Sequence, residues 1–230
     1  ATSSALLMTG MQDPRFEDCG FFGGFRGVAE HVTAGGTYTY KFLNCRFSDS
    51  QDAALYLQKC IARIADFQGG YPGRHWLRSD DASVTLEDGF VAGAGPGTET
   101  IVKQTGLDYG GSLVVRDVIQ DSEGDGGPTE AGIAVWPGFA LGCDLEIDGF
   151  GVGTTAATAP VVRLFGGGGP ARHRVHRIRR LGAWPGEHRA PCYLWLGSSA
   201  WTGTYEPDDF GGIPALEVAP GVECRLRVPD

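Results

Sequence analysis

The chain has 230 residues, a formal net charge of −9 and a hydrophobic fraction of 42%. This composition excludes a disordered chain, and the length suits one large domain. The negative charge disfavours nucleic acid and anionic membranes as partners, because phosphate contacts need a basic surface. No run approaches the roughly eighteen apolar residues of a transmembrane helix, so we expect no membrane partner.

The N-terminal segment 1–13 lacks the basic region and apolar core of a signal peptide. Either such a peptide has been removed or only an initiator Met is missing, and Ala1 suits both. The apolar stretch Leu6–Met8, with Met11, predicts that residues 1–13 form a cap or arm across one end of the domain.

Two families of short apolar segments then alternate along the chain. Members of the first carry an acid or small polar residue in or just after the run; they are 16–19, 42–45, 84–88, 114–117, 145–148 and 175–178. Successive anchors of this family, Leu86, Val115, Leu145 and Val175, are about 30 residues apart each time. Near the N-terminus, Phe16 and Phe42 are spaced slightly more closely.

The second family advances at a similar rate. Its members are 53–57, 132–135, 160–164, 192–196 and 214–218, and its anchors Val135, Leu164 and Leu196 are again about 30 residues apart. Period-2 alternation and flanking glycine clusters, among 37 glycines in all, indicate strands. Residues 52–67 alone have a helical alternative, because Leu55, Ile61 and Ile64 share one helix face.

Two interleaved strand families that advance together indicate a chain that returns to the same place once per period. We therefore predict an all-β fold, a single-stranded parallel β-helix (β-solenoid) with about 30 residues per coil, as one domain over residues 1–230. Wide loops are expected at 66–82, 119–131 and 198–212. A β-sandwich or jelly roll would explain the short strands but not the repeated spacing.

Recurring units such as 132–135 followed by 145–150 resemble the right-handed parallel β-helix (pectin-lyase-like) superfamily over most of residues 14–228. That superfamily includes polysaccharide lyases and hydrolases, viral tailspikes and other virion surface proteins. Many members stack asparagines in one turn, whereas this chain has only Asn44.

Three aspartates fall at similar positions of successive coils, namely Asp88, Asp117 and Asp148. As candidate catalytic residues they would form a carboxylate row able to hold a cation or protonate a leaving oxygen. As turn residues they would only bond their own backbone. Arg116 beside Asp117 does not make a lyase site, since adjacent strand residues point to opposite faces.

The segment 172–180 is basic in an otherwise acidic chain. Its arginines, expected to bind a partner or a glycan, are Arg172, Arg174, Arg177, Arg179 and Arg180. They fit an anionic glycan or, as we prefer, a neighbouring subunit. Alternatively they pair with acids of the preceding coil, such as Glu146 and Asp148.

Aromatic residues gather in the last quarter of the chain. Segment 201–210 is expected to be an exposed loop in which Trp201 and Tyr205 bind glycan, with burial of the rings as the alternative.

Neither a metal nor a cofactor is expected. The six cysteines contain no C-x-x-C pair and are interpreted as buried thiols more readily than as disulfides. The histidines lack zinc spacing, no G-x-S-x-G is present, and Gly89–Gly97 lacks the G-K-[ST] of a phosphate loop.

The absence of a recognisable catalytic set favours a non-catalytic structural protein. With the resemblance, the leading hypothesis is a capsid decoration subunit or tailspike-like component, located on a virion surface or outside the cell. Its partners would be other subunits, as a homo-oligomer such as a trimer, and surface polysaccharide. The alternatives are a polysaccharide lyase or glycoside hydrolase acting along the β-helix groove, and a carbohydrate-binding module.

Overall fold

The computed structural model describes residues 4–9, 11–31, 38–94, 97–106, 111–121, 127–138, 141–153, 159–166, 170–183, 191–207 and 213–229. These residues form strands and short connections. They contain no helix, and therefore no helix that could span a membrane. The segment with a helical alternative, 52–67, lies in two strands.

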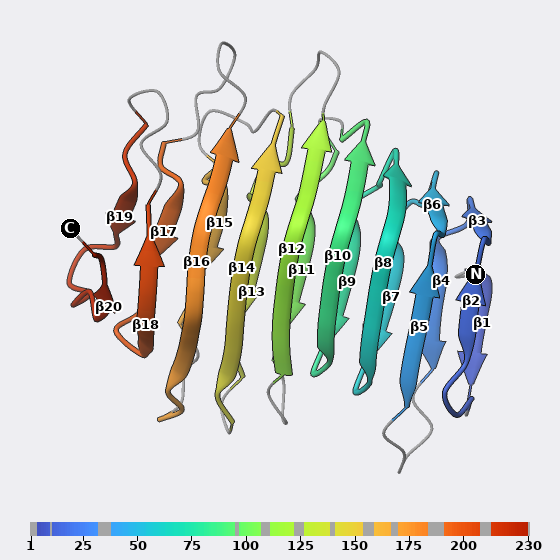
Figure 1. Cartoon of the computed structure of the whole chain (residues 1–230), viewed down its shortest axis with the longest axis horizontal. Helices are drawn as coiled ribbons and strands as arrows, with labels where there is room; N and C mark the ends of the chain where they lie inside the picture. Colours follow the sequence, from blue (N-terminus) through green and yellow to red (C-terminus); the bar gives the residue numbers. More distant parts are fainter. Residues whose placement is uncertain are drawn as a thin grey trace.

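Two long parallel sheets run side by side through the molecule (Figure 1). Sheet A has nine strands in the order β1 (Ser4–Thr9), β4 (Arg26–His31), β7 (Ala53–Gln58), β9 (His75–Asp80), β11 (Thr100–Thr105), β13 (Ala131–Trp136), β15 (Val162–Leu164), β17 (Leu194–Leu196) and β19 (Leu216–Val218). Sheet B runs β2 (Arg15–Glu17), β5 (Thr39–Leu43), β8 (Ile61–Gly70), β10 (Ser83–Ala92), β12 (Gly111–Asp121), β14 (Cys143–Val152), β16 (His173–Ala183), β18 (Trp201–Glu206) and β20 (Leu226–Arg227), with β3 (Gly20–Phe22) and β6 (Arg46–Ser48) beside this path.

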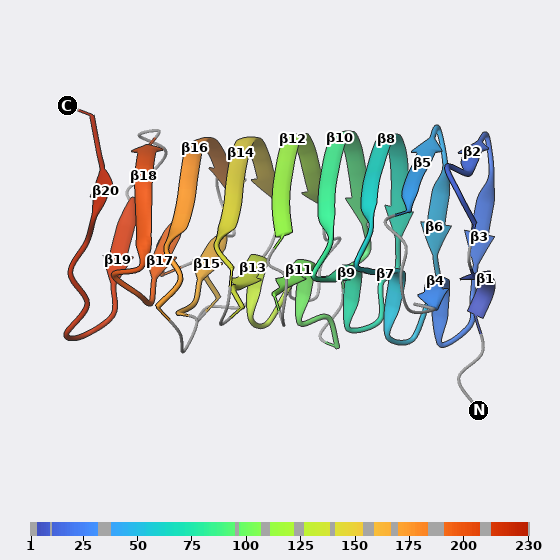
Figure 2. The same cartoon turned by 90° about the horizontal axis from the view of Figure 1, so that it is seen from below.

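The chain alternates between the sheets, so one strand from each forms a coil that stacks on the previous coil (Figure 2). The all-β, parallel prediction is confirmed, and the arrangement is compatible with a β-solenoid. The two sheets do not close into one hydrogen-bonded sheet. The β-sandwich alternative is wrong, because it needs antiparallel strands, whereas the strand pairs of the described residues are parallel.

The repeat is less regular than the sequence suggested. Leu86 opposes Val115, as predicted. Val115, however, opposes Ile147 and not Leu145, so this coil is longer than the anchor spacing implied. The coil that leads from Ala53 to His75 is much shorter. Because the connections between successive strands differ in length, the expected period of about 30 residues holds for the middle coils only.

Inward side chains stack from coil to coil into one continuous core. In sheet A, Leu55 lies against Leu77 and then Val102, each fully buried. Burying such a side chain contributes roughly 1.5–3 kcal/mol relative to leaving it exposed. Between the sheets, the ring of Phe67 on β8 stacks on Trp76 on β9 with centroids 4.4 Å apart. The core therefore extends along the whole stack and does not centre on one layer.

Two of the three expected loops contain strands. Residues 66–82 include β9, and 198–212 include β18. The expected loop 119–131 begins inside β12, and its residues 122–126 lie outside the described part. Residues 4–9 form β1, an end strand of sheet A that pairs with β4.

A residue in the left-handed conformation bends sheet B at the same register in seven coils. We call these residues the corner row; they are Asp18, Asn44, Asp66, Asp88, Asp117, Gly149 and Arg180, with φ between 49° and 87°. Aspartate, asparagine and glycine tolerate this conformation better than other residues. The only asparagine therefore does lie in a stacked turn, where its side-chain amide donates to Asp18 Oδ1 at 2.5 Å.

The positive φ of the corner row predicts that position 66 strongly prefers residues that tolerate the left-handed conformation. Asp66→Val should lower the free energy of unfolding by about 1–2 kcal/mol, because a β-branched residue is strained at positive φ. The matched control Asp66→Gly should leave it unchanged or slightly raised. Urea denaturation measures both variants, and equal stability of the two would contradict a conformational constraint at the corner.

Candidate functional site

The three predicted carboxylates do not form one row. Asp88 and Asp117 are opposed within the corner row, as expected. Asp148 lies one position earlier in its strand and opposes Arg116. The cause is the longer coil between β12 and β14, which moves glycine, Gly149, into the corner.

Two arginines of the basic segment close over these acids. Asp148 accepts hydrogen bonds from Arg179 at 2.6 Å and from Arg180 at 2.7 Å, and Arg180 also reaches Asp117 at 2.9 Å. The bond from Arg179, followed by that from Arg180, lowers the pKa of Asp148 to about 2. Asp148 is therefore ionised at neutral pH and cannot serve as a proton donor.

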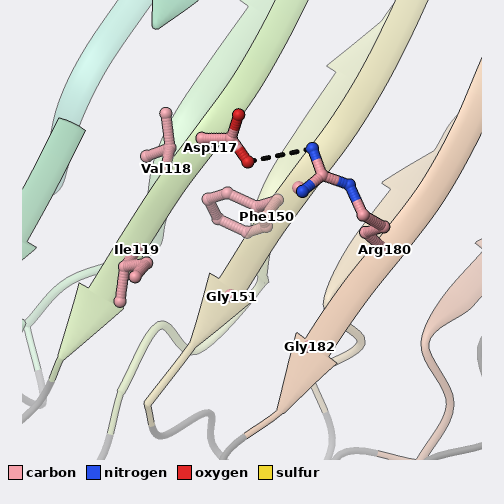
Figure 3. Close-up of a pocket in the computed structure, with 8 residues that line it drawn as sticks. Asp117, Val118, Ile119, Phe150, Gly151, Arg180 and Gly182 are labelled. Carbon is pink, nitrogen blue, oxygen red and sulfur yellow. Dashed lines mark ion pairs between the residues drawn. The ribbon is translucent and has the colours of Figure 1, made fainter. Parts of the chain in front are cut away.

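Gly149 makes this arrangement possible. A Cβ on Gly149 would lie 2.6 Å from Asp117 Oδ1 and 3.1 Å from the Arg180 guanidinium. Because Gly149 has no Cβ, the Arg180 side chain crosses β14. It thereby joins its own corner position on β16 to that of Asp117 on β12, two coils away. Figure 3 shows the ion pair between Asp117 and Arg180 passing over this strand.

The other arginines of segment 172–180 form fewer ion pairs. Arg177 lies 3.5 Å from Glu206, on the following coil. Arg172 and Arg174 are exposed and form no ion pair among the described residues. Pairing with acids of the preceding coil is thus confirmed for Asp148 only.

A shallow pocket of about 230 Å³ lies beside the Asp117–Arg180 pair (Figure 3). Its floor includes Gly151 and Gly182, and Ile119 stands at its edge. Asp117 and Arg180, one candidate of each kind, thus line a pocket together with three glycines.

Trp201 and Tyr205 are core residues, so the expected exposed loop is wrong for residues 201–207. They are 0% and 1% exposed, within β18. The Trp201 indole donates to the Phe165 carbonyl at 2.8 Å, and the Tyr205 hydroxyl donates to the Ala215 carbonyl at 2.7 Å. Residues 208–212 lie outside the described part.

Sequence reasoning missed the aromatic residues on the outer face of sheet A. We call Trp136, Phe165, Trp195 and Arg163 the ring face. Trp136 is 36% exposed and stacks on Phe165, with centroids 3.4 Å apart. Phe165 lies 5.7 Å from Trp195. The Arg163 guanidinium lies 5.0 Å from Trp195 and 5.5 Å from Phe165.

One signal could have revealed this face. Trp136 and Phe165 each directly follow a predicted inward anchor, Val135 and Leu164, which are themselves opposed. Alternation along a strand then puts both rings on the outside, one coil apart.

A polar cluster continues the same face toward the N-terminal coils. The Tyr56 hydroxyl donates to Asp80 Oδ2 at 2.8 Å, and Arg78 donates to the same oxygen at 3.3 Å. Burial and the Asp80 carboxylate raise the pKa of Tyr56 to about 12. The Asp80 side chain is 4% exposed, and its Oδ1 has no hydrogen-bond partner among the described residues.

Within the described residues, no group of three or more His, Cys, Asp or Glu side chains is arranged to hold a metal ion. The six cysteines are present as free thiols, and Cys45, Cys60, Cys143 and Cys192 are buried.

Comparison with known proteins gives no relative: no family model, no curated protein and no solved structure matches the chain.

The Asp148 ion pairs predict an acid-dependent loss of stability. The pKa of Asp148 falls from 3.8 to about 2 on folding, so its contribution is present above about pH 4 and lost as the pH drops toward 2. Asp148→Asn should lower the free energy of unfolding by about 1 kcal/mol at neutral pH, since solvent screens the half-exposed Arg180. The difference should shrink as the pH falls from about 4 and vanish only below about pH 2.

Chemical denaturation at several pH values measures this difference. Asp66→Asn, at an exposed corner position, is the matched control and should show no comparable pH dependence. A constant difference between wild type and Asp148→Asn at all pH values would contradict the ion-pair explanation.

Proposed function

We propose that this chain is a non-catalytic protein of a surface assembly, such as a virion, and that it holds an elongated carbohydrate chain along the ring face. In this proposal the stacked sheets are a single-stranded parallel β-helix of the pectin-lyase-like kind. The other subunits of the assembly and a surface polysaccharide are its partners.

The observation that carries the proposal is the continuity of the ring face. Strands β13, β15 and β17 are neighbours about 4.8 Å apart, so the three rings follow one another over about 10 Å. An aromatic side chain offers an apolar surface, and Arg163 adds donors for hydroxyl or carboxylate groups. The Arg163 Nε is buried and has no hydrogen-bond partner among the described residues.

The state of the acids supports a binding role over catalysis on sheet B. Asp117 and Asp148 are each held by an arginine, at 2.9 Å and 2.6 Å respectively. A hydrolase needs one protonated and one free carboxyl group at a fixed separation. Asp148 is ionised, and both carboxylates are bound to Arg180.

Trp136→Ala should weaken binding to the recognised polysaccharide at least about tenfold, because it removes the most exposed ring of the face. Affinity electrophoresis through gels containing different polysaccharides measures the retardation. Phe22→Ala is the matched control, since Phe22 is an exposed ring on β3, outside the ring face. Equal retardation of both variants, or none for wild type on a broad panel, would reject the proposal.

Asp80 favours a second candidate function, a polysaccharide lyase or hydrolase. A buried carboxylate oxygen without a partner is costly unless a substrate or water completes it. Tyr56 adjoins Asp80, and its raised pKa keeps the hydroxyl protonated, as a proton donor requires.

For this second function, Asp80→Asn should abolish release of new reducing ends or unsaturated products while leaving retention in the gel unchanged. Asp88→Asn, an acid on sheet B, is the control and should retain full turnover. Wild-type protein without any turnover would reject the enzyme and leave the binding role intact.

A further inference from the structure

Beyond the corner row, sheet B carries a second outward row with an unusual order of residues. Phe90, Ile119, Gly151 and Gly182 oppose one another in sequence across β10, β12, β14 and β16. Phe90 is 40% exposed and Ile119 is 43% exposed. Two apolar projections are therefore followed, at equal steps of about 4.8 Å, by two positions without a side chain.

The fold does not require these two glycines. Neither has a positive φ, and a Cβ would have its nearest neighbour at 4.0 Å on Gly151 and at 3.7 Å on Gly182. By contrast, a Cβ on Gly89 would overlap the Phe67 ring. Glycine inside a strand weakens it, and where packing gives no reason it often marks the close approach of another backbone or a ligand.

We propose that this face of sheet B is the interface of a homodimer, in which the projections of one copy fill the hollow of the other. The two-fold axis lies in the interface, between β12 and β14, parallel to the part of these strands that follows the corner row. It places Ile119 on the partner's Gly151 and Phe90 on the partner's Gly182. Each contact occurs twice, as a two-fold interface requires.

The same two-fold axis also brings opposite charges together at the corner row. The axis that pairs Phe90 with the partner's Gly182 also brings Asp88 to the partner's Arg180, because both lie in the corner row on β10 and β16. Asp88 is exposed and forms no ion pair among the described residues.

Complementary charge of this kind sets the register of an interface and excludes other partners. A second copy of this chain matches the face in shape and in charge at once, which is why we infer it over an unrelated protein.

The interface does not depend on the carbohydrate proposal. Sheet A is on another side of the stack, so the ring faces of both copies stay accessible (Figure 2).

Sedimentation velocity over a dilution series tests the dimer. Wild type should dissociate reversibly on dilution. Gly151→Ile should raise the dissociation constant at least about tenfold, because it places two branched side chains against each other. Ile119→Gly should also weaken the dimer, by leaving the hollow empty. The exchange variant Ile119→Gly/Gly151→Ile should restore association, since projection and hollow have only changed places.

Gly97→Ile is the matched control, since a Cβ there has no neighbour within 4 Å and the residue lies outside sheet B. Circular dichroism checks that each variant folds. Asp88→Lys, at the exposed corner of β10, should weaken the dimer by bringing two cations together. A wild type that is monomeric at every concentration overturns the proposal. So does a dimer that Gly151→Ile and Asp88→Lys leave unchanged, or one that the exchange variant fails to restore.

Discussion

The structure of sheet B depends on one conformational constraint, the left-handed residue at each corner. It bends the long strands without breaking the hydrogen-bonded ladder on either side, so both halves stay in register from coil to coil. Because the bend recurs at one register, Asp117, Gly149 and Arg180 become neighbours although a whole coil of chain separates each from the next. The ion pairs and the pocket beside them follow from this stacking.

The sequence allowed the parallel all-β fold to be predicted, because inward residues must recur each time the chain returns to the same place. Leu164 above Leu196 illustrates this. It did not allow the register to be predicted everywhere. Leu145 and Ile147 both point inward, so a slip from one to the other leaves the apolar pattern intact. The slip moves Asp148 from the position opposite Val118, which the anchors imply, to the position opposite Arg116.

The prediction of the site failed where the alternation of inward and outward residues is interrupted. Strand β16 shifts register between Val175 and Ile178 relative to β18, so His176 and Arg177 are both exposed. Counting across such a bulge gives no reliable face for Tyr205, which pairs with Ile178 beyond the shift and lies in the core. Trp136 has no interruption between it and its anchor, and its outward position could have been deduced.

The unequal length of the coils has a consequence for how such a chain can change. A short coil from Ala53 to His75 and a long one from Val162 to Leu194 join strands of the same ladder, so the connections vary while the paired backbone does not. Residues can then be gained or lost at these connections without displacing the coils above and below. The stack is suited to diversification of its periphery, by natural variation or by grafting of peptides, while the paired strands stay unchanged.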